Sequence, residues 1–411
     1  MKRIIVLSLL TMLIRLCIWA QLMTIAGTVV SEATGQPLAA ASVSGGGQTV
    51  VTNDDGYFQL KSQGPIEQIT VTHVGYRTGQ YIISQQPVGE LHIRLKPSAV
   101  QLQEVLVVGI SDPRELVNTA ISKIPQNFSQ QPQLYHCFYR ETAMKRQHYI
   151  MVAEGTVDMY KTSYRYNVSR DRVAIRKGRR LLSPRQSDTL SVKVLGGPVT
   201  PVVLDIVKNP DILLNPNDLD CYELKMEEPT TIADRQQYVV SIAPKLPMPW
   251  ALYYGKLYID QQTLTFTRAE MSLDMSDREK ATRLMLVRKP AGVRFRPKEL
   301  SLLVDYHLDD DGLTYISYVR STFRFNCDWR RRLFTTSFTA FCEMVVTHRA
   351  GNEETVQPIN GRESFDQRDA FFDKVDYFRD PTFWQNYNII EPTESLDRAI
   401  DRLLKRYKDQ E

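Results

Sequence analysis

Apolar and polar residues alternate with a period of two along the first hundred residues, in short runs that turn-forming residues interrupt. Residues 24–30 alternate as a half-buried strand does, and Gly35-Gln36-Pro37 breaks the run. Similar runs follow at 38–43, 49–52, 57–60, 69–74, 81–83 and 91–95. The turn Asn53-Asp54-Asp55-Gly56 predicts a hairpin between two of them. Seven short strands at this spacing predict a β-sandwich of fewer than about 100 residues.

The periodicity then changes to that of a helix. Asp112 is a capping acid, Pro113 suits the first turn, and Glu115 stands three residues after the cap. The residues that share one face are Leu116, Val117, Ala120, Ile121 and Ile124. We expect Pro125 to end this helix, which lies in a linker over 110–130.

Strand-like periodicity returns after residue 131 and continues almost to the C-terminus. The predicted strands are a pair within 134–164, followed by 238–242, 255–260, 264–273, 282–287, 300–308, 313–325 and 335–346. Short turns, such as the one at 309–312, make consecutive strands antiparallel neighbours. Thr393 caps a final helix with one apolar stripe, formed by Leu396, Ile400, Leu403 and Leu404.

The fold class is therefore mainly β, with an N-terminal seven-stranded β-sandwich followed by a large curved antiparallel sheet with linker and C-terminal helices. The predicted divisions are a signal peptide at 1–20, the sandwich at 21–109, the linker helix at 110–130 and the large β domain at 131–411.

Three runs carry a family resemblance: "IAGTVVSEATGQPLAAASVSGGGQTVVTNDDGYFQLKS", "ITVTHVGYRT" and "LHIRLKPSAVQLQEVLVVG". They resemble the carboxypeptidase regulatory-like domain, a transthyretin-like sandwich common in envelope proteins of the Bacteroidetes. This resemblance implies a non-catalytic module. No His-x-x-Glu follows any of the six histidines, so the zinc site of the carboxypeptidases is missing.

Three further segments resemble envelope proteins. "YYGKLYIDQQTLTFTRAEMSLDM" is similar to hairpins of periplasmic lipoprotein carriers of the LolA/LolB type, which implies an apolar concave face for an acyl chain or a peptide. "Phe-Tyr-Arg-Glu" at 138–141 and the run 383–392 resemble segments of Bacteroidetes envelope proteins that carry the same sandwich.

The N-terminus has the features of a secretory signal. Met1-Lys2-Arg3 is basic and 4–14 is apolar, and we expect cleavage after Ala20, which leaves Gln21 first. An uncleaved membrane anchor is the alternative, but the apolar run is about half the roughly 20 residues that span a bilayer. Cleavage lowers the formal charge from +4 to about +1, which gives no electrostatic reason to expect nucleic acid as a partner.

Four cysteines follow the leader, and an exported protein is free to form disulfides. Cys327 and Cys342 are nearest in sequence, and closing their loop of about 15 residues would contribute roughly 3 kcal/mol. The alternative is that all four are buried free thiols on strands.

A basic segment at 165–185 is the candidate partner-binding site. Its central cations are Arg172, Arg176, Lys177, Arg179 and Arg180. Such a segment can bind anionic sugars, lipid headgroups or peptide carboxylates. The alternative is a solvated strand face or loop, with the acids of 205–228 neutralising it within the fold.

No catalytic, cofactor-binding or metal-ligating residue is predicted, because the motifs of serine hydrolases, zinc peptidases, phosphate-binding loops and dinucleotide-binding folds are missing. We therefore expect a non-catalytic binding or scaffolding protein of the bacterial periplasm or outer-membrane face. Its partner would be an envelope protein, peptide, glycan or lipid. The alternatives are a lipid or lipoprotein carrier that uses a concave sheet, and an envelope hydrolase with no recognisable motif.

Overall fold

A computed structural model describes residues 22–83, 89–98, 112–185, 188, 192–329, 335–350, 356–377, 380 and 382–408. The chain divides into two compact units, which we treat separately. Unit 1 comprises Met1–Pro97 and Asp380–Thr393, and unit 2 comprises Ser98–Arg379 and Glu394–Glu411. The expected signal-peptide cleavage site, Ala20 and Gln21, lies outside the described residues.

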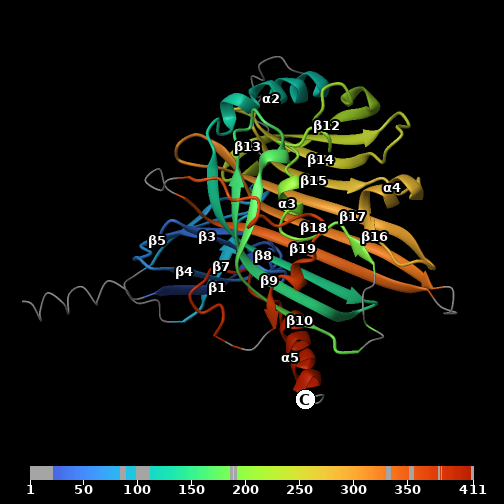
Figure 1. Cartoon of the computed structure of the whole chain (residues 1–411). Helices are drawn as coiled ribbons and strands as arrows, with labels where there is room; N and C mark the ends of the chain where they lie inside the picture. The colour runs from blue at the N-terminus through green and yellow to red at the C-terminus, as the bar shows by residue number, and fades with distance from the viewer. Residues whose placement is uncertain are drawn as a thin grey trace, which may run out of the picture. The chain divides into compact units, whose positions relative to one another are not determined.

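Unit 1 is built on the predicted seven-stranded sandwich (Figure 1). One sheet has the order β4-β1-β7 and the other β3-β2-β5-β6. The strands are β1 (Met23–Ser31), β2 (Ser42–Gly45), β3 (Gln48–Val51), β4 (Tyr57–Ser62), β5 (Gln68–Thr72), β6 (Gly79–Ile82) and β7 (Leu91–Leu95). Alternate residues of each strand, including Val29, Val43, Phe58, Val71 and Ile93, form the core between the two sheets.

The hairpin predicted across Asn53–Gly56 is wrong. β3 pairs with β2, whereas β4 pairs with β1, so the turn carries the chain from one sheet to the other. The Asn53 side chain accepts hydrogen bonds from the backbone N–H groups of Asp55 and Tyr57, which stabilises the turn locally. A sandwich needs such crossings, and they have the same turn chemistry as a hairpin.

The segment Asp380–Thr393 completes unit 1 although it lies nearly 300 residues after the sandwich in sequence. The Asn388 side chain accepts a hydrogen bond from Lys61 N at 2.7 Å and donates one to Lys61 O at 2.8 Å. Lys61 Nζ donates to the carbonyl oxygens of Trp384 and Tyr387. Because β4 is an edge strand, these contacts satisfy backbone groups that its sheet leaves unpaired.

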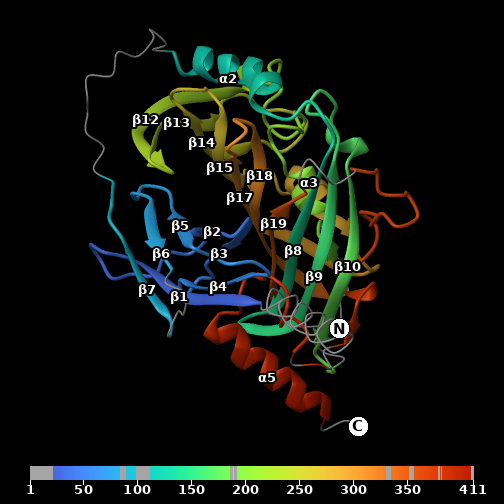
Figure 2. The ribbon, with the colours of Figure 1, turned by 90° about the vertical axis from the view of Figure 1, so that its left-hand side faces the viewer.

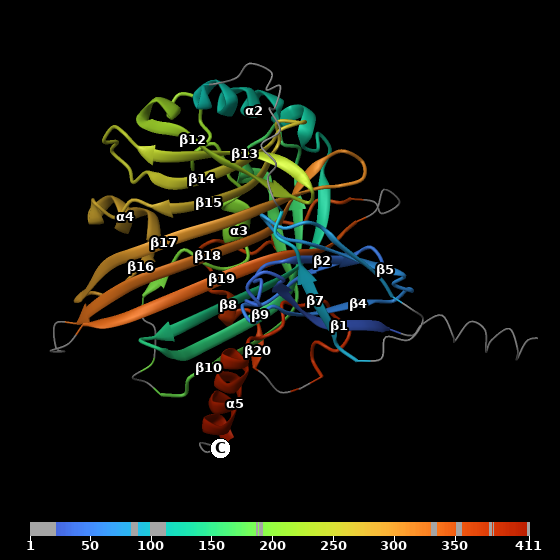
Figure 3. The ribbon, with the colours of Figure 1, turned by 180° about the vertical axis from the view of Figure 1, so that it is seen from behind.

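Unit 2 contains an eleven-stranded sheet with the order β12-β13-β14-β15-β17-β18-β19-β8-β9-β10-β20. Figure 3 shows its strands following one another in this order, and Figure 2 shows how strongly the sheet bends. All neighbours are antiparallel except β10 and β20. The strands are β8 (Gln133–Lys145), β9 (His148–Lys161), β10 (Arg172–Leu182), β12 (Tyr222–Ile232), β13 (Arg235–Pro244), β14 (Tyr253–Asp260), β15 (Phe266–Leu273), β17 (Val293–Leu308), β18 (Thr314–Trp329), β19 (Thr336–Arg349) and β20 (Asp376–Tyr377).

The mainly β fold class is thus confirmed, with one error among the predicted strands of unit 2. Residues 282–285 belong to the helix α4 (Arg278–Met285), whose N-cap Asp277 accepts hydrogen bonds from Glu279 N and Lys280 N. Only β16 (Leu286–Arg288) of the predicted strand 282–287 is extended, and it pairs with β11 (Lys193–Val194).

The predicted linker helix is α2 (Pro113–Asn127), capped by Asp112. Leu116, Val117 and Ala120 are buried as expected, but Pro125 lies inside the helix and does not end it. The final helix, α5 (Glu394–Lys408), packs Leu396, Ile400 and Leu403 on Val152 and Leu181 of the sheet.

One face of the large sheet, which we call the covered face, is occupied by α2 and by the connection 192–221. This connection includes α3 (Thr200–Val203), which Figures 1 and 2 show beside the central strands. Val202, Leu204 and Ile206 from the connection are fully buried in the same core as Phe323 and Tyr139 from the strands. The connection therefore fills part of the apolar sheet surface that a LolA/LolB-type carrier would use for an acyl chain or a peptide.

Candidate functional site

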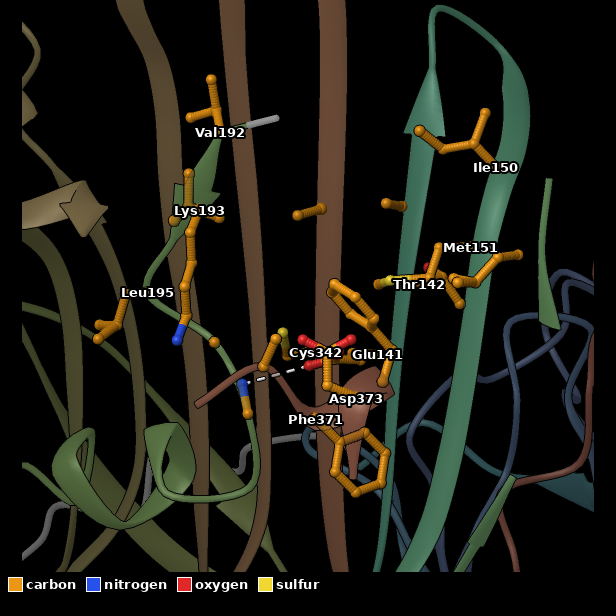
Figure 4. Close-up of a pocket in the computed structure, with 18 of the residues that line it drawn as sticks. Glu141, Thr142, Ile150, Met151, Val192, Lys193, Leu195, Cys342, Phe371 and Asp373 are labelled. Atoms are coloured by element: carbon orange, nitrogen blue, oxygen red, sulfur yellow. Dashed lines mark hydrogen bonds between the residues drawn. The ribbon is translucent and has the colours of Figure 1, made fainter. Parts of the chain in front are cut away.

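A pocket of about 240 Å³ remains on the covered face of unit 2. It lies between β8, β9 and β19 on one side and residues 192–197 on the other, and residues 369–373 close one end (Figure 4). Its apolar walls are formed by Ala143, Ile150, Met151, Leu182, Val192, Val194, Leu195, Ala340, Phe371 and Phe372. In Figure 4, Val192 and Lys193 lie opposite Ile150 and Met151, with Glu141 and Cys342 between these walls.

Glu141 is the buried carboxyl group of this pocket. The alternation along β8 places it on the covered face, and pairing with β19 places it directly opposite Cys342. Tyr139 Oη donates a hydrogen bond to Glu141 Oε2 at 2.9 Å, and Gly197 N donates to the same oxygen at 3.2 Å. The Oε1 atom accepts no hydrogen bond from the described residues.

The environment of Glu141 favours its protonated form. Burial raises the pKa of this carboxyl group to about 7, although the hydrogen bonds from Tyr139 and Gly197 and the charge of Lys193 oppose the shift. The ion pairs within 4 Å that the structure describes do not include Glu141. The carboxyl group of Glu141 thus lines the pocket, is shielded from bulk solvent and has no cation in contact among the described residues.

Gly197 has a backbone conformation that supports this arrangement. Its φ angle is +81°, in the left-handed region that other residues rarely adopt, and a Cβ there would lie 2.5 Å from Cε1 of Phe365. Glycine is therefore the residue that both this φ and this close approach require. The resulting turn directs the Gly197 N–H at Glu141.

Charged groups surround the pocket, and most of them already have partners. Lys193 Nζ donates to the carbonyl oxygens of Gln367 at 3.1 Å and Asp369 at 2.5 Å, and burial lowers its pKa against the opposing charge of Asp369. Asp188 accepts from Lys145 Nζ at 3.0 Å. Arg288 pairs with Lys193 across the two short strands and is exposed at the rim.

Cys342 also lines the pocket, but its side chain is a protonated thiol at neutral pH. Burial raises its pKa to about 12, and the charge of Glu141 adds to this effect. The reactive form of cysteine is the thiolate, so this side chain is a poor nucleophile at neutral pH. The described residues also contain no group of three or more His, Cys, Asp or Glu side chains placed to hold a metal ion.

A separate cluster of buried charges anchors the connection that forms one wall of the pocket. Lys161 Nζ lies 2.8 Å from Asp205 Oδ2, and Lys208 Nζ lies 2.6 Å from Asp171 Oδ1. Burial favours a raised pKa for Asp205, but Lys161 and two tyrosine hydroxyl groups outweigh it and lower the pKa. Each charge of this cluster thus has an opposite charge in contact, in contrast to Glu141.

The structure places the predicted basic residues on β10, where most of them contact groups of the fold. Arg176 Nε lies 2.6 Å from Asp158 and Arg179 Nε lies 3.0 Å from Glu154, both acids of β9. The remaining members also have contacts. Arg172 donates hydrogen bonds to the carbonyl oxygens of Ser169 and Asp171, and Arg180 donates one to the carbonyl oxygen of Phe372. Lys177 has an interaction partner as well. The neighbouring strand, and not the acids of 205–228, supplies the carboxylates for Arg176 and Arg179.

The disulfide expected between Cys327 and Cys342 is not formed, and all four described cysteines are buried free thiols. Cys327 lies opposite Thr336 in the β18–β19 ladder, and Cys342 lies opposite Ser321. Six residues of strand separate these two positions, which is roughly 20 Å. A disulfide requires Cα atoms within about 7 Å, so this strand register excludes the pair.

The sequence did not identify Glu141 as a site residue, although a signal was present. Tyr139, Glu141 and Ala143 alternate on one face of a strand, and a lone acid among inward-facing residues indicates an unusual environment. The other wall of the pocket was not detectable, because 192–197 has no regular periodicity.

Among the described residues, no helix has both the length and the apolar character needed to cross a membrane. A comparison with curated proteins gives no match.

Three solved structures share a limited similarity with this chain. A DUF1329 family protein from Desulfovibrio piger is 10% identical, with 59% of this chain and 96% of that chain covered and a TM-score of 0.24. A putative outer membrane lipoprotein-sorting protein domain from Vibrio parahaemolyticus is 7% identical, with 60% of this chain and 94% of that chain covered and a TM-score of 0.26. A LolA superfamily protein from Nitrosomonas europaea is 14% identical, with 56% of this chain and 93% of that chain covered and a TM-score of 0.20. With TM-scores this low, we base no argument on these similarities.

The N-terminal resemblance has direct support. Residues 25–107 match the family model of the CarboxypepD_reg-like domain, and the described part of this range forms the two-sheet sandwich of unit 1. The N-terminal module of this chain is therefore a CarboxypepD_reg-like domain.

Proposed function

We propose that this chain is a non-catalytic binding protein of the bacterial periplasm or outer-membrane face, and that the pocket of unit 2 receives an apolar part of its ligand. The observation that carries this proposal is an apolar-walled pocket with one buried carboxyl group at its surface. The CarboxypepD_reg-like module and the expected secretory leader support the location.

The pocket chemistry favours binding over catalysis. Cys342 is a protonated thiol at neutral pH, and no histidine is among the described residues that line the pocket. Glu141 has a pKa in the range of a general base, but a base needs a nucleophile or a substrate proton within hydrogen-bonding reach. The described lining residues provide no second activated group, so an envelope hydrolase is the weaker hypothesis.

The size of the pocket limits what it can hold. Pockets for drug-sized ligands have volumes of about 300–1,000 Å³, whereas this one has about 240 Å³. It therefore fits a short alkyl chain or one large side chain. A lipid or lipoprotein carrier is the second candidate, favoured by the apolar walls, but residues of the connection 192–221 pack into the same core as the strands and reduce the room for a whole acyl chain.

Binding of short alkyl compounds tests this proposal. We expect hexanol and its analogues to bind the native protein in calorimetry or ligand-observed NMR. The variant Ala340→Leu adds three carbon atoms to the pocket wall and should weaken binding at least tenfold. Ala291→Leu, which adds the same atoms at an exposed turn, is the matched control and should bind as the native protein does. Failure of every alkyl compound to bind, or equal binding by Ala340→Leu, would contradict the proposal.

A further inference from the structure

We infer that the ligand of this pocket is a primary amine on a short aliphatic body, whose ammonium group contacts Glu141 while the alkyl chain lies against the apolar walls. This inference rests on the proposed function, since it names the ligand class of the same pocket. It starts from the unused oxygen of Glu141. Both described hydrogen bonds go to Oε2, which leaves Oε1 as an acceptor at the pocket surface.

A buried carboxylate is stable only when cations or several hydrogen-bond donors compensate its charge. Glu141 accepts hydrogen bonds from two donors and has no cation in contact among the described residues. The residue is only 7% exposed. Its pKa of about 7 reflects this missing compensation. An ammonium group supplies a positive charge and three donors, so it is the ligand group that best completes the site.

The other acids around the pocket have cations in contact, which leaves Glu141 as the acid whose charge a cationic ligand would neutralise. The titratable or charged groups that line the pocket or contact this carboxyl group are Tyr139 on β8, Cys342 on β19, Asp188, Lys193 on β11, Arg288 on β16, Asp369 and Asp373. Each of the three aspartates already has a cation within 4 Å: Lys145 for Asp188, Lys374 for Asp369 and Arg180 for Asp373. Lys193 directs its ammonium group at two backbone carbonyl oxygens, so it does not neutralise Glu141 by contact.

An anionic ligand faces a larger electrostatic cost. A carboxylate head would have to lie beside Glu141, and one of the two groups would then have to hold a proton. Arg288 lines the pocket but is exposed to solvent, which weakens its attraction for an anion. The same chain length with a different head group consequently separates the two alternatives.

The test compares hexylamine, hexanol and hexanoate at pH 8 with the full chain. We expect hexylamine to bind at least tenfold more tightly than either analogue, because hydrogen bonds to charged groups are the stronger ones. Its affinity should fall as the pH decreases from 8 to 5.5, since protonation of Glu141 removes the carboxylate. Nα-acetyl-lysine methylamide forms a further arm: tight binding shows that a lysine side chain is accepted, and weak binding restricts the class to free alkylamines.

The variant Glu141→Gln provides the decisive comparison, because it keeps the shape and removes the charge. We expect it to reduce the ratio of hexylamine to hexanol affinity from at least ten to about one, and to abolish the pH dependence. The pH series on the native protein gives the same information without any substitution. Equal binding of all three compounds, or a preference for hexanoate, overturns this inference and leaves the proposed function intact. Absence of binding by all three refutes both.

Discussion

Replacing Glu141 by Gln should make unit 2 more stable at neutral and alkaline pH. The carboxyl group has a pKa of about 7 in the folded chain and an ordinary value of 4.5. Ionising it in the folded state therefore costs about 3 kcal/mol more than in the unfolded state. The group is buried, so solvent screening does not reduce this figure much.

The direction of the pH effect follows from proton linkage. Below pH 4.5 both states hold the proton, and Glu141 does not affect the pH dependence of stability. Between pH 4.5 and 7 the unfolded chain loses the proton first, so the free energy of unfolding falls as the pH rises. Well above pH 7 both states are ionised, and the free energy of unfolding no longer changes with pH through this group. The difference in stability between Glu141→Gln and the native chain should thus grow by about 2.5 kcal/mol from pH 5 to pH 8.

Urea unfolding at pH 5, 6, 7 and 8, followed by far-ultraviolet circular dichroism, measures this difference. The transition of unit 2 is the one to read, because two compact units need not unfold together. Glu227→Gln removes an exposed acid from β12 and is the matched control, with an expected effect within about 0.5 kcal/mol at every pH. If the difference for Glu141→Gln stays constant from pH 5 to pH 8, Glu141 titrates as an exposed acid and the reasoning about its burial is wrong.

Three further substitutions or measurements test other parts of the structure. Gly197→Ala should destabilise unit 2 by about 2 kcal/mol or more in thermal unfolding, because its φ is +81° and the new Cβ would clash with Phe365. The control Gly361→Ala should have almost no effect, because the space around Gly361 is open. Lys208→Met should cost about 3–5 kcal/mol in urea unfolding, because it leaves Asp171 with less compensation for its buried charge, and adding Asp171→Asn should recover part of this loss. Thiol titration without reductant should detect the four described cysteines as free thiols in denaturant and almost no reactivity in the native chain; a disulfide found by mass spectrometry would contradict the strand register.

Local patterns predicted most of the strands because side-chain alternation depends on only a few neighbouring residues. The buried positions of β7 and the N-cap of α2 agree with their sequence patterns. Errors occurred where the same local signal has two structural meanings. The turn at Asn53–Gly56 is compatible with a hairpin or a crossing between sheets, and only the pairing of β4 with β1 decides between them. In α4, the cap Asp277 was a usable helix signal that the apolar residues after it obscured.

The candidate site was harder to predict, because it depends on contacts between distant segments. Glu141 lies opposite Cys342, some 200 residues later, and accepts a hydrogen bond from Gly197 in an irregular connection. No periodicity specifies these contacts. The basic segment illustrates the opposite case: its charge is obvious in the sequence, but the carboxylates of Asp158 and Glu154 that contact Arg176 and Arg179 are identified only by the register of β9 and β10.

The two groups of buried charge in unit 2 show why Glu141 is better explained by a ligand than by the fold. Lys161, Asp171, Asp205 and Lys208 are fully buried, yet each has an opposite charge within 4 Å, so this fold is able to compensate the charges it buries. Glu141 lacks such compensation at a position where glutamine would fit and would avoid a cost of about 3 kcal/mol at neutral pH. Residues that reduce stability without a local benefit are characteristic of binding and catalytic sites. Since the uncompensated oxygen faces the pocket, a cationic ligand there would remove the cost that the protein alone does not.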